Sequence, residues 1–173
     1  GKGWYKPDEL FVNLQGDEPE IDPQAVTDLI NVMDAVEYVP VGTLAAYRMI
    51  DELRNHHHLN RVSPNLVKAV IDRQGDALYF SRQEICDKPL HQLWHLGIYA
   101  YRKTSLLWFA STPPTPPELV ENLEQLRWLY HGRKVRVVLT DEGHKGIDTR
   151  EDYDEFLKRR EFAAQSRLHR GTM

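Results

Sequence analysis

Residues 12–19 read VNLQGDEP and mark the change from strand to polar loop that decides the fold. The run 11–14 has the apolar character of a short β-strand, and a polar break follows it directly. In an open α/β sheet, ligands bind in the crevice at the carboxyl ends of the strands. We therefore expect Asp17 to face a ligand from a strand end, with Gly16 letting the backbone come close.

A single hard carboxylate in that position suits Mg²⁺, which takes one or two carboxylates together with phosphate oxygens. Asp17 therefore indicates a magnesium ion that holds a nucleotide phosphate. An ordinary acidic turn explains the same residues equally well, because Gly, Asp and Pro are common in turns. Both interpretations stay open on this segment alone.

Strand-like and helix-like segments alternate along the chain, which indicates an α/β fold. Asp22 and Thr149 are expected helix N-caps, and proline at position 23 suits the first helical residue. We expect strands at 11–14, 39–46, 66–71, 77–80, 95–102 and 134–139, a hairpin turn at 73–76, and helices from residue 23, near 105–110, from 116 and from 150.

Residues 115–118 read TPPE, a capping box with proline at the first helical position. It predicts one helix from Pro116 to about Tyr130, which Gly132 ends. Its buried stripe would consist of Leu119, Leu123, Leu126 and Tyr130, leaving Glu121 and Gln125 one turn apart on a polar face.

The chain has 173 residues, with 22 basic and 26 acidic side chains and a net charge of −4. This length fits one domain, which we assign to residues 1–164, with a flexible polar tail at 165–173. The charge does not favour nucleic acid, and no apolar run reaches the roughly 20 residues of a membrane span. The first residues do not read as a signal peptide, and the single Cys86 fits a reducing cytoplasm.

Two other motifs carry little weight. His56, His57 and His58 are consecutive, and adjacent residues of an extended loop rarely converge on one ion, so we expect a solvated loop there. The GKG at residues 1–3 lacks the strand, the longer glycine-rich loop and the Ser or Thr of a phosphate-binding loop.

Four further segments follow VNLQGDEP in a fixed order: ALYFSR at 77–82, HLGIYAYR at 95–102, ENLEQLR at 121–127 and GIDTRED at 146–152. Together they resemble CMP-Kdo synthetase, the 3-deoxy-manno-octulosonate (Kdo) cytidylyltransferase of lipopolysaccharide assembly, from about Leu10 to Leu157. The resemblance implies a Rossmann-like α/β nucleotidyltransferase with a mixed, mostly parallel sheet flanked by helices. It also implies a cytoplasmic homodimer that uses Mg²⁺ to join CTP and Kdo into CMP-Kdo and pyrophosphate.

The resemblance assigns Asp17 and Asp148 to the metal and so to catalysis. From the residues alone, a loop acid near the positive end of the last helix is the favoured interpretation of Asp148, and the family pattern reverses that preference. In GIDTRED, Ile147 and Arg150 stand where the family has valine and proline, which alters helix entry more than chemistry.

The other assigned residues bind substrate. The resemblance gives Gln15 a sugar contact and Arg82 the Kdo carboxylate, which a planar guanidinium can grip in a bidentate pair. His95 and Tyr99 have the same parity on one strand and would lie beside the sugar. The remaining sugar contacts fall on the helix from Pro116, at Glu121, Glu124 and Gln125. Without the family resemblance, Arg82 reads as an exposed arginine at a strand end. His95 and Tyr99 then read as core residues, and the polar side of the helix from Pro116 reads as a solvated face.

The chain departs from the family before residue 12, where members have a first strand and a triphosphate-binding loop rich in Arg, Gly and Lys. We therefore expect the C-terminal part of one nucleotidyltransferase domain, truncated at its N-terminus, rather than a shortened homologue. The loop at 84–93 is also shorter than in the family, which leaves the acceptor open. Amino-Kdo, another ulosonic acid and a phosphonate are alternative acceptors, and a non-catalytic sugar-binding homologue is the rival of another class.

Overall fold

The computed structural model describes residues 8–49, 66–85, 93–143 and 146–170. The histidine triplet, the GKG segment and Cys86 lie outside these residues. The strands are β1 (Leu10–Asn13), β2 (Val41–Met49), β3 (Lys68–Ile71), β4 (Ala77–Ser81), β5 (Leu93–Arg102) and β6 (Val135–Gly143), and the helices are α1 (Pro23–Ala35), α3 (Lys103–Ser111), α4 (Pro116–Glu121), α5 (Leu126–Tyr130) and α6 (Arg150–Arg170).

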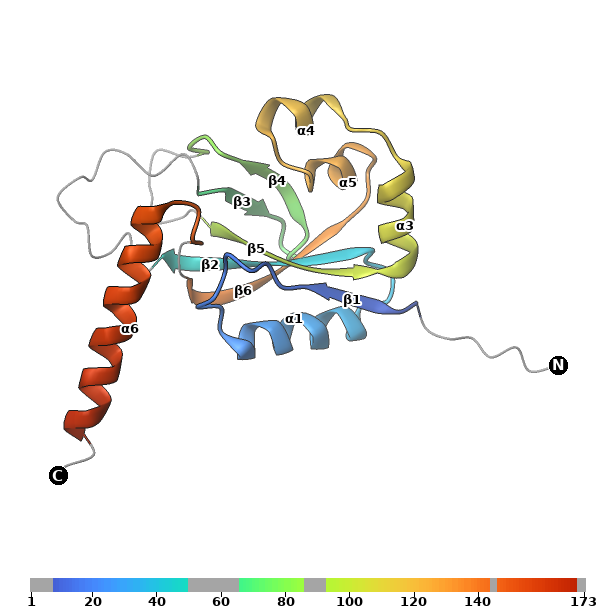
Figure 1. Ribbon diagram of the computed structural model, residues 1–173. Coiled ribbons are helices and arrows are strands. Elements are labelled where there is room, and N and C mark those ends of the chain that lie inside the picture. Colours follow the sequence, from blue (N-terminus) through green and yellow to red (C-terminus); the bar gives the residue numbers. More distant parts are fainter. Residues whose placement is uncertain (1–7, 50–65, 86–92, 144–145, 171–173) are drawn as a thin grey trace.

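One six-stranded sheet forms the centre of the molecule (Figure 1). Its order is β4-β3-β5-β2-β6, and β1 pairs with β5 beside this path. The expected mixed sheet flanked by helices is confirmed. The expectation that it is mostly parallel is wrong for the described strands, because only β2 and β6 pair in parallel. Strand β5 runs antiparallel to β1, β2 and β3, and the β3–β4 hairpin adds another antiparallel pair.

Two apolar layers cover the sheet, one on each face. Helix α1 packs against one face, and α3, α4 and α5 gather on the other (Figure 1). Alternation along β5 divides its side chains between the layers: Trp94, Leu96, Ile98 and Ala100 belong to the α1 layer, and Leu93, Tyr99 and Tyr101 to the other. His95 and Tyr99, which were expected to share one face of this strand, do so, because their rings lie side by side.

The β3–β4 hairpin turns where the sequence predicted it. The Asp72 carboxylate accepts hydrogen bonds from the backbone N–H groups of Gln74 (2.8 Å) and Asp76 (2.9 Å), and Gly75 has the left-handed φ of +84° that glycine tolerates. Asp76 is buried and pairs with Lys134 at 2.5 Å and Arg136 at 2.7 Å. These ion pairs connect the hairpin to the β6 segment across the sheet.

Both predicted N-caps are confirmed. The Asp22 carboxylate accepts from the backbone N–H of Gln24 at 2.9 Å and starts α1. Before α6, the Thr149 hydroxyl oxygen accepts from the backbone N–H of Asp152 at 3.2 Å, and the Asp152 carboxylate accepts in return from the backbone N–H of Thr149 at 2.9 Å. Helix α6 runs away from the sheet (Figure 1) and includes residues 165–170 of the expected tail. No helix within the described ranges is long and apolar enough to cross a membrane.

The single helix predicted from Pro116 to Tyr130 is wrong, because it is divided at Asn122. This residue adopts the left-handed conformation (φ 54°, ψ 49°) that Asn tolerates, so α4 ends there and α5 begins at Leu126. The break lets Arg127 reach back to the Glu118 carboxylate with its Nε at 2.8 Å. It also abolishes the predicted stripe: Leu119 and Tyr130 are 70% and 57% exposed.

Close contact between α1 and β2 generates a stability prediction. A Cβ atom added at Gly42 would lie 2.6 Å from Met33 Sδ and 2.9 Å from Leu29 Cδ1, both side chains of α1. We expect Gly42→Ala to lower the free energy of unfolding by about 1–3 kcal/mol through overpacking. Urea denaturation measures the change, with Gly16→Ala as the control because nothing lies within 4 Å of its added Cβ. Equal stability of the two variants would contradict this packing.

Candidate functional site

One cavity of about 250 Å³ gathers most of the residues predicted for the site. Seven of the nine line it: Gln15, Asp17, Arg82, His95, Tyr99, Gln125 and Asp148. They come from the loop after β1, the end of β4, strand β5, the turn before α5 and the loop before α6. Segments that are distant in sequence thus converge on one concave surface, as ligand sites require.

A backbone contact joins the two acidic segments. The N–H of Ile147 donates to the Asp17 carbonyl oxygen at 2.8 Å, so residues 146–148 lie against the loop after β1. A Cβ added at Gly146 would come within 3.4 Å of the Asp17 carbonyl oxygen, so glycine suits this approach. This contact accounts for the presence of Asp17 and Asp148, 131 positions apart, in the same cavity.

Glu18 adds a third carboxylate that the sequence analysis missed. It lines the cavity, where its burial and the negative charge of Asp17, with a smaller effect from Asp148, raise its pKa to about 7. A hydrogen bond from the Gly97 backbone opposes this rise. The position of Glu18, directly after Asp17 in VNLQGDEP, was the available signal.

The donor set fits a magnesium ion that a phosphate helps to hold. Within the described part of the chain, the carboxylates of Asp17 and Asp148 have no hydrogen-bond or ion-pair partner, and no three His, Cys, Asp or Glu side chains are placed to hold a metal together. Mg²⁺ commonly keeps only one or two carboxylates and takes its other ligands from phosphates and water. Two unpaired carboxylates beside a cavity match that requirement.

Arg82 is held at the end of β4 by the C-terminus of α4. Its Nε donates to the Glu121 carbonyl oxygen at 3.2 Å, and its backbone N–H donates to a Glu121 carboxylate oxygen at 3.0 Å. The other Glu121 oxygen accepts from Ser81 Oγ at 3.0 Å. Glu121 therefore does not line the cavity in this structure; it positions the arginine that does.

The helix break explains the positions of Gln125 and Glu124, the other two predicted residues of this region. Gln125 is buried and lines the cavity, because the turn between α4 and α5 directs it inward. Glu124 is exposed and does not line the cavity. The predicted polar face of Glu121 and Gln125 was wrong, since a continuous helix is needed to stack them.

His95 and Tyr99 lie side by side on β5, with ring centroids 5.5 Å apart. Burial lowers the pKa of His95 to about 3, so the imidazole is neutral at physiological pH. Burial also raises the pKa of Tyr99 well above its ordinary value, so the phenol keeps its proton. Both residues can therefore offer neutral hydrogen-bonding groups to a ligand.

Gly97, between these two residues, also lines the cavity and was missed. A Cβ added there would lie 3.1 Å from Gln15 Oε1. The absent side chain thus makes room for the Gln15 amide, and its parity with His95 and Tyr99 was the signal in the sequence.

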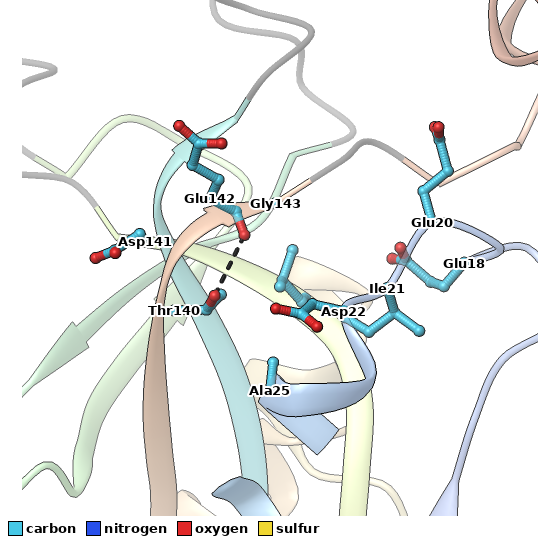
Figure 2. Close-up of a pocket in the computed structure, with 10 residues that line it drawn as sticks. Glu18, Glu20, Ile21, Asp22, Ala25, Thr140, Asp141, Glu142 and Gly143 are labelled. Carbon is cyan, nitrogen blue, oxygen red and sulfur yellow. Dashed lines mark hydrogen bonds between the residues drawn. The ribbon is translucent and has the colours of Figure 1, made fainter. Parts of the chain in front are cut away.

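A second cavity, of about 410 Å³, lies between the end of β6 and the start of α1. Its lining is rich in carboxylates: Glu18, Glu20, Asp22, Asp141 and Glu142 (Figure 2). Glu20 pairs with Arg159 of α6 at 2.5 Å. Glu18 belongs to both cavities, whereas no residue predicted for the site lines this larger one.

Comparison with known proteins finds a consistent set of relatives. A family model described as cytidylyltransferase matches residues 4–135. The 3-deoxy-manno-octulosonate cytidylyltransferases of Geobacter metallireducens and Syntrophotalea carbinolica are 38% and 40% identical to this chain and cover 87% and 83% of it. The matches span only 63% and 60% of those relatives, so the chain corresponds to about three fifths of their length.

The fold comparison agrees. A solved structure of CMP:2-keto-3-deoxy-manno-octonic acid synthetase complexed with CTP matches with a TM-score of 0.72 at 35% identity, covering 91% of this chain and 62% of that one. The resemblance inferred from the sequence motifs, and the nucleotidyltransferase fold it implied, are thereby confirmed.

The raised pKa of Glu18 predicts a pH dependence of stability. The folded state retains a proton that the unfolded chain, with the ordinary glutamate pKa, releases at lower pH. The contribution of Glu18 to the free energy of unfolding therefore falls as pH rises from about 5 to about 7, opposite in sign to that of His95, whose pKa is lowered, and Glu18→Gln removes it. Urea denaturation across that range measures it, with the exposed Glu37→Gln as the control. An unchanged pH slope in Glu18→Gln would contradict the burial of this carboxylate among like charges.

Proposed function

The chain belongs to the cytidylyltransferase family, and we propose that it acts in the transfer of CMP from CTP to Kdo, with release of pyrophosphate, for lipopolysaccharide biosynthesis. One observation carries the proposal: seven residues that the family motifs assign to sugar and metal line one cavity. The relatives' names support the choice of CTP and Kdo. Homodimerisation and a cytoplasmic location stay predictions of the resemblance.

In this reaction the anomeric hydroxyl oxygen of Kdo forms a bond to the α-phosphorus of CTP. The bond from that phosphorus to the bridging oxygen breaks, pyrophosphate leaves, and the hydroxyl gives its proton to water. Asp17 and Asp148 would hold Mg²⁺, which supplies charge neutralisation at the reacting phosphate when bound. The protein's own contribution is positioning, because such transfers ask little covalent chemistry of side chains.

Other residues that line the cavity would bind the acceptor. The Arg82 guanidinium, aligned by the end of α4, suits the carboxylate of Kdo. Gln15, His95, Tyr99 and Gln125 provide neutral groups for the sugar hydroxyls. Amino-Kdo, other ulosonic acids and phosphonates also carry an anionic group for Arg82, and comparing their turnover with that of Kdo identifies the acceptor.

Pyrophosphate release from CTP, Kdo and Mg²⁺ tests the proposal directly. We expect Asp17→Asn and Asp148→Asn to reduce turnover by orders of magnitude, because each removes a charged ligand of the metal. The matched control is Asp141→Asn, whose carboxylate lies in the other cavity, and it should retain turnover. Full activity in either site variant would refute a shared metal site.

Binding measurements test the proposal in the case where the chain folds but does not convert its substrates. Mg²⁺ should raise the melting temperature of the wild type but not of Asp17→Asn, because the ion binds only the folded state. A non-catalytic sugar-binding homologue would instead bind Kdo with an affinity that is independent of CTP and Mg²⁺. Tight CTP binding by isothermal titration would exclude that rival.

Arg82 provides a separate test of the acceptor side. We expect Arg82→Lys to weaken Kdo binding by about 10- to 100-fold, because a lysine cannot reproduce a bidentate contact with a carboxylate. Titration of Kdo measures the loss, and Arg73→Lys in the exposed hairpin turn is the matched control. Equal Kdo affinity of Arg82→Lys and wild type would place the acceptor carboxylate elsewhere.

A further inference from the structure

Strand β5 carries an irregularity next to the candidate site. Thr43 of β2 pairs with Tyr99, but the next residue, Leu44, pairs with Leu96. Gly97 and Ile98 therefore have no partner on β2, and the ladder of hydrogen bonds is interrupted there. Bulges of this kind are frequent beside active sites, where they redirect side chains.

The side chain of Thr43 fills this interruption. Thr43 is fully buried, and its hydroxyl lies 2.7 Å from the Ile98 carbonyl oxygen and 3.3 Å from that of Leu96. The same hydroxyl oxygen lies 2.9 Å from Nε2 of His95. A threonine from a neighbouring strand thus contacts both the bulge and the histidine that lines the cavity.

The proton balance of this group decides the tautomer of the histidine. A hydroxyl has one proton to donate, and a carbonyl oxygen can only accept. The Thr43 proton belongs to the contact with Ile98, since the alternative would leave two acceptor oxygens facing each other at 2.7 Å. Nε2 of His95 must then carry its own proton and donate it to Thr43. In a neutral imidazole this leaves Nδ1 as an acceptor.

Ring contacts fix the orientation of the histidine. The ring of Phe80 meets His95 edge-on at 5.0 Å between centroids, and Tyr99 packs at 5.5 Å. Nδ1 has no hydrogen-bond partner in the described portion of the chain. It is the ring atom with which His95 can accept a hydrogen bond from a ligand.

We propose that Thr43 is a positioning residue that holds His95 in the Nε2–H tautomer, so that Nδ1 accepts a hydrogen bond from a hydroxyl of the acceptor. The ligand half of this inference rests on the proposed function, whereas the tautomer rests on the geometry of β2 and β5 alone. The arrangement selects a hydrogen-bond donor at this point of the cavity and disfavours a carboxylate. It therefore separates the work of His95 from that of Arg82, which takes the acid group.

Long-range ¹H–¹⁵N correlation spectra of the imidazole test the tautomer without any substrate. We expect the wild type and Thr43→Ser to show a protonated Nε2 and a bare Nδ1, because serine keeps the hydroxyl. In Thr43→Val the signals should move toward a mixture of tautomers. Gly42→Ala is the control for a general loss of packing, since it perturbs the same strand on its other face. A protonated Nδ1 in the wild type overturns the proposal, and this result does not depend on how any variant folds.

Kdo titrations test the ligand half. We expect Thr43→Val to weaken Kdo binding about tenfold, the equivalent of one hydrogen bond, with CTP binding unchanged and with Thr43→Ser restoring the affinity. Equal Kdo affinity in Thr43→Val and wild type overturns the assigned contact. Failure of every variant and the wild type to bind Kdo refutes the proposed acceptor, while the spectra still report on the tautomer.

Discussion

The pairing of β5 with three other strands is the constraint on which the site depends. This strand hydrogen-bonds to β1, β2 and β3, and it thereby fixes the loop after β1 relative to the end of β4. Its own residues His95, Gly97 and Tyr99 line the same cavity. A shift of one residue in its register would turn all three toward the α1 layer, since side chains alternate between the faces of a strand. The chemistry of the cavity is therefore secured by the same hydrogen bonds that build the sheet.

The unfavourable proximity of three carboxylates indicates a functional rather than a structural role for this part of the cavity. Asp17, Glu18 and Asp148 stand together, and burial, followed by the negative charges of Asp17 and Asp148, raises the pKa of Glu18. By contrast, the buried carboxylates of Asp76 and Glu118 are paired with cations: Asp76 with Lys134 and Arg136, and Glu118 with Arg127. Natural chains keep uncompensated like charges mainly where a ligand offsets them, so this contrast supports a bound cation beside Asp17 and Asp148.

Signals that act over a few residues could be predicted from the sequence, and those that need distant partners could not. Asp22 and Thr149 cap helices by accepting from backbone N–H groups two or three residues away, so the local sequence pattern was sufficient. The break at Asn122 accompanies the burial of Leu123 and the contact of Arg127 with Glu118, nine residues earlier, and helix propensity does not reveal either of them. Likewise, the mostly antiparallel sheet follows from where β5 inserts, which periodicity does not reveal.

The candidate site shows the same division at the level of single residues. Family motifs identified seven side chains that line the cavity and also assigned Glu121, which does not line it. In the structure both Glu121 carboxylate oxygens accept hydrogen bonds, one from Ser81 of β4 and one from Arg82 after it, and a motif alone does not show such contacts. Thr43 lies in no recognised motif, and only the bulge in β5 shows why a hydroxyl is useful at that position. A positioning residue of this kind can be recognised only from the hydrogen-bond donors and acceptors that surround each residue lining the cavity.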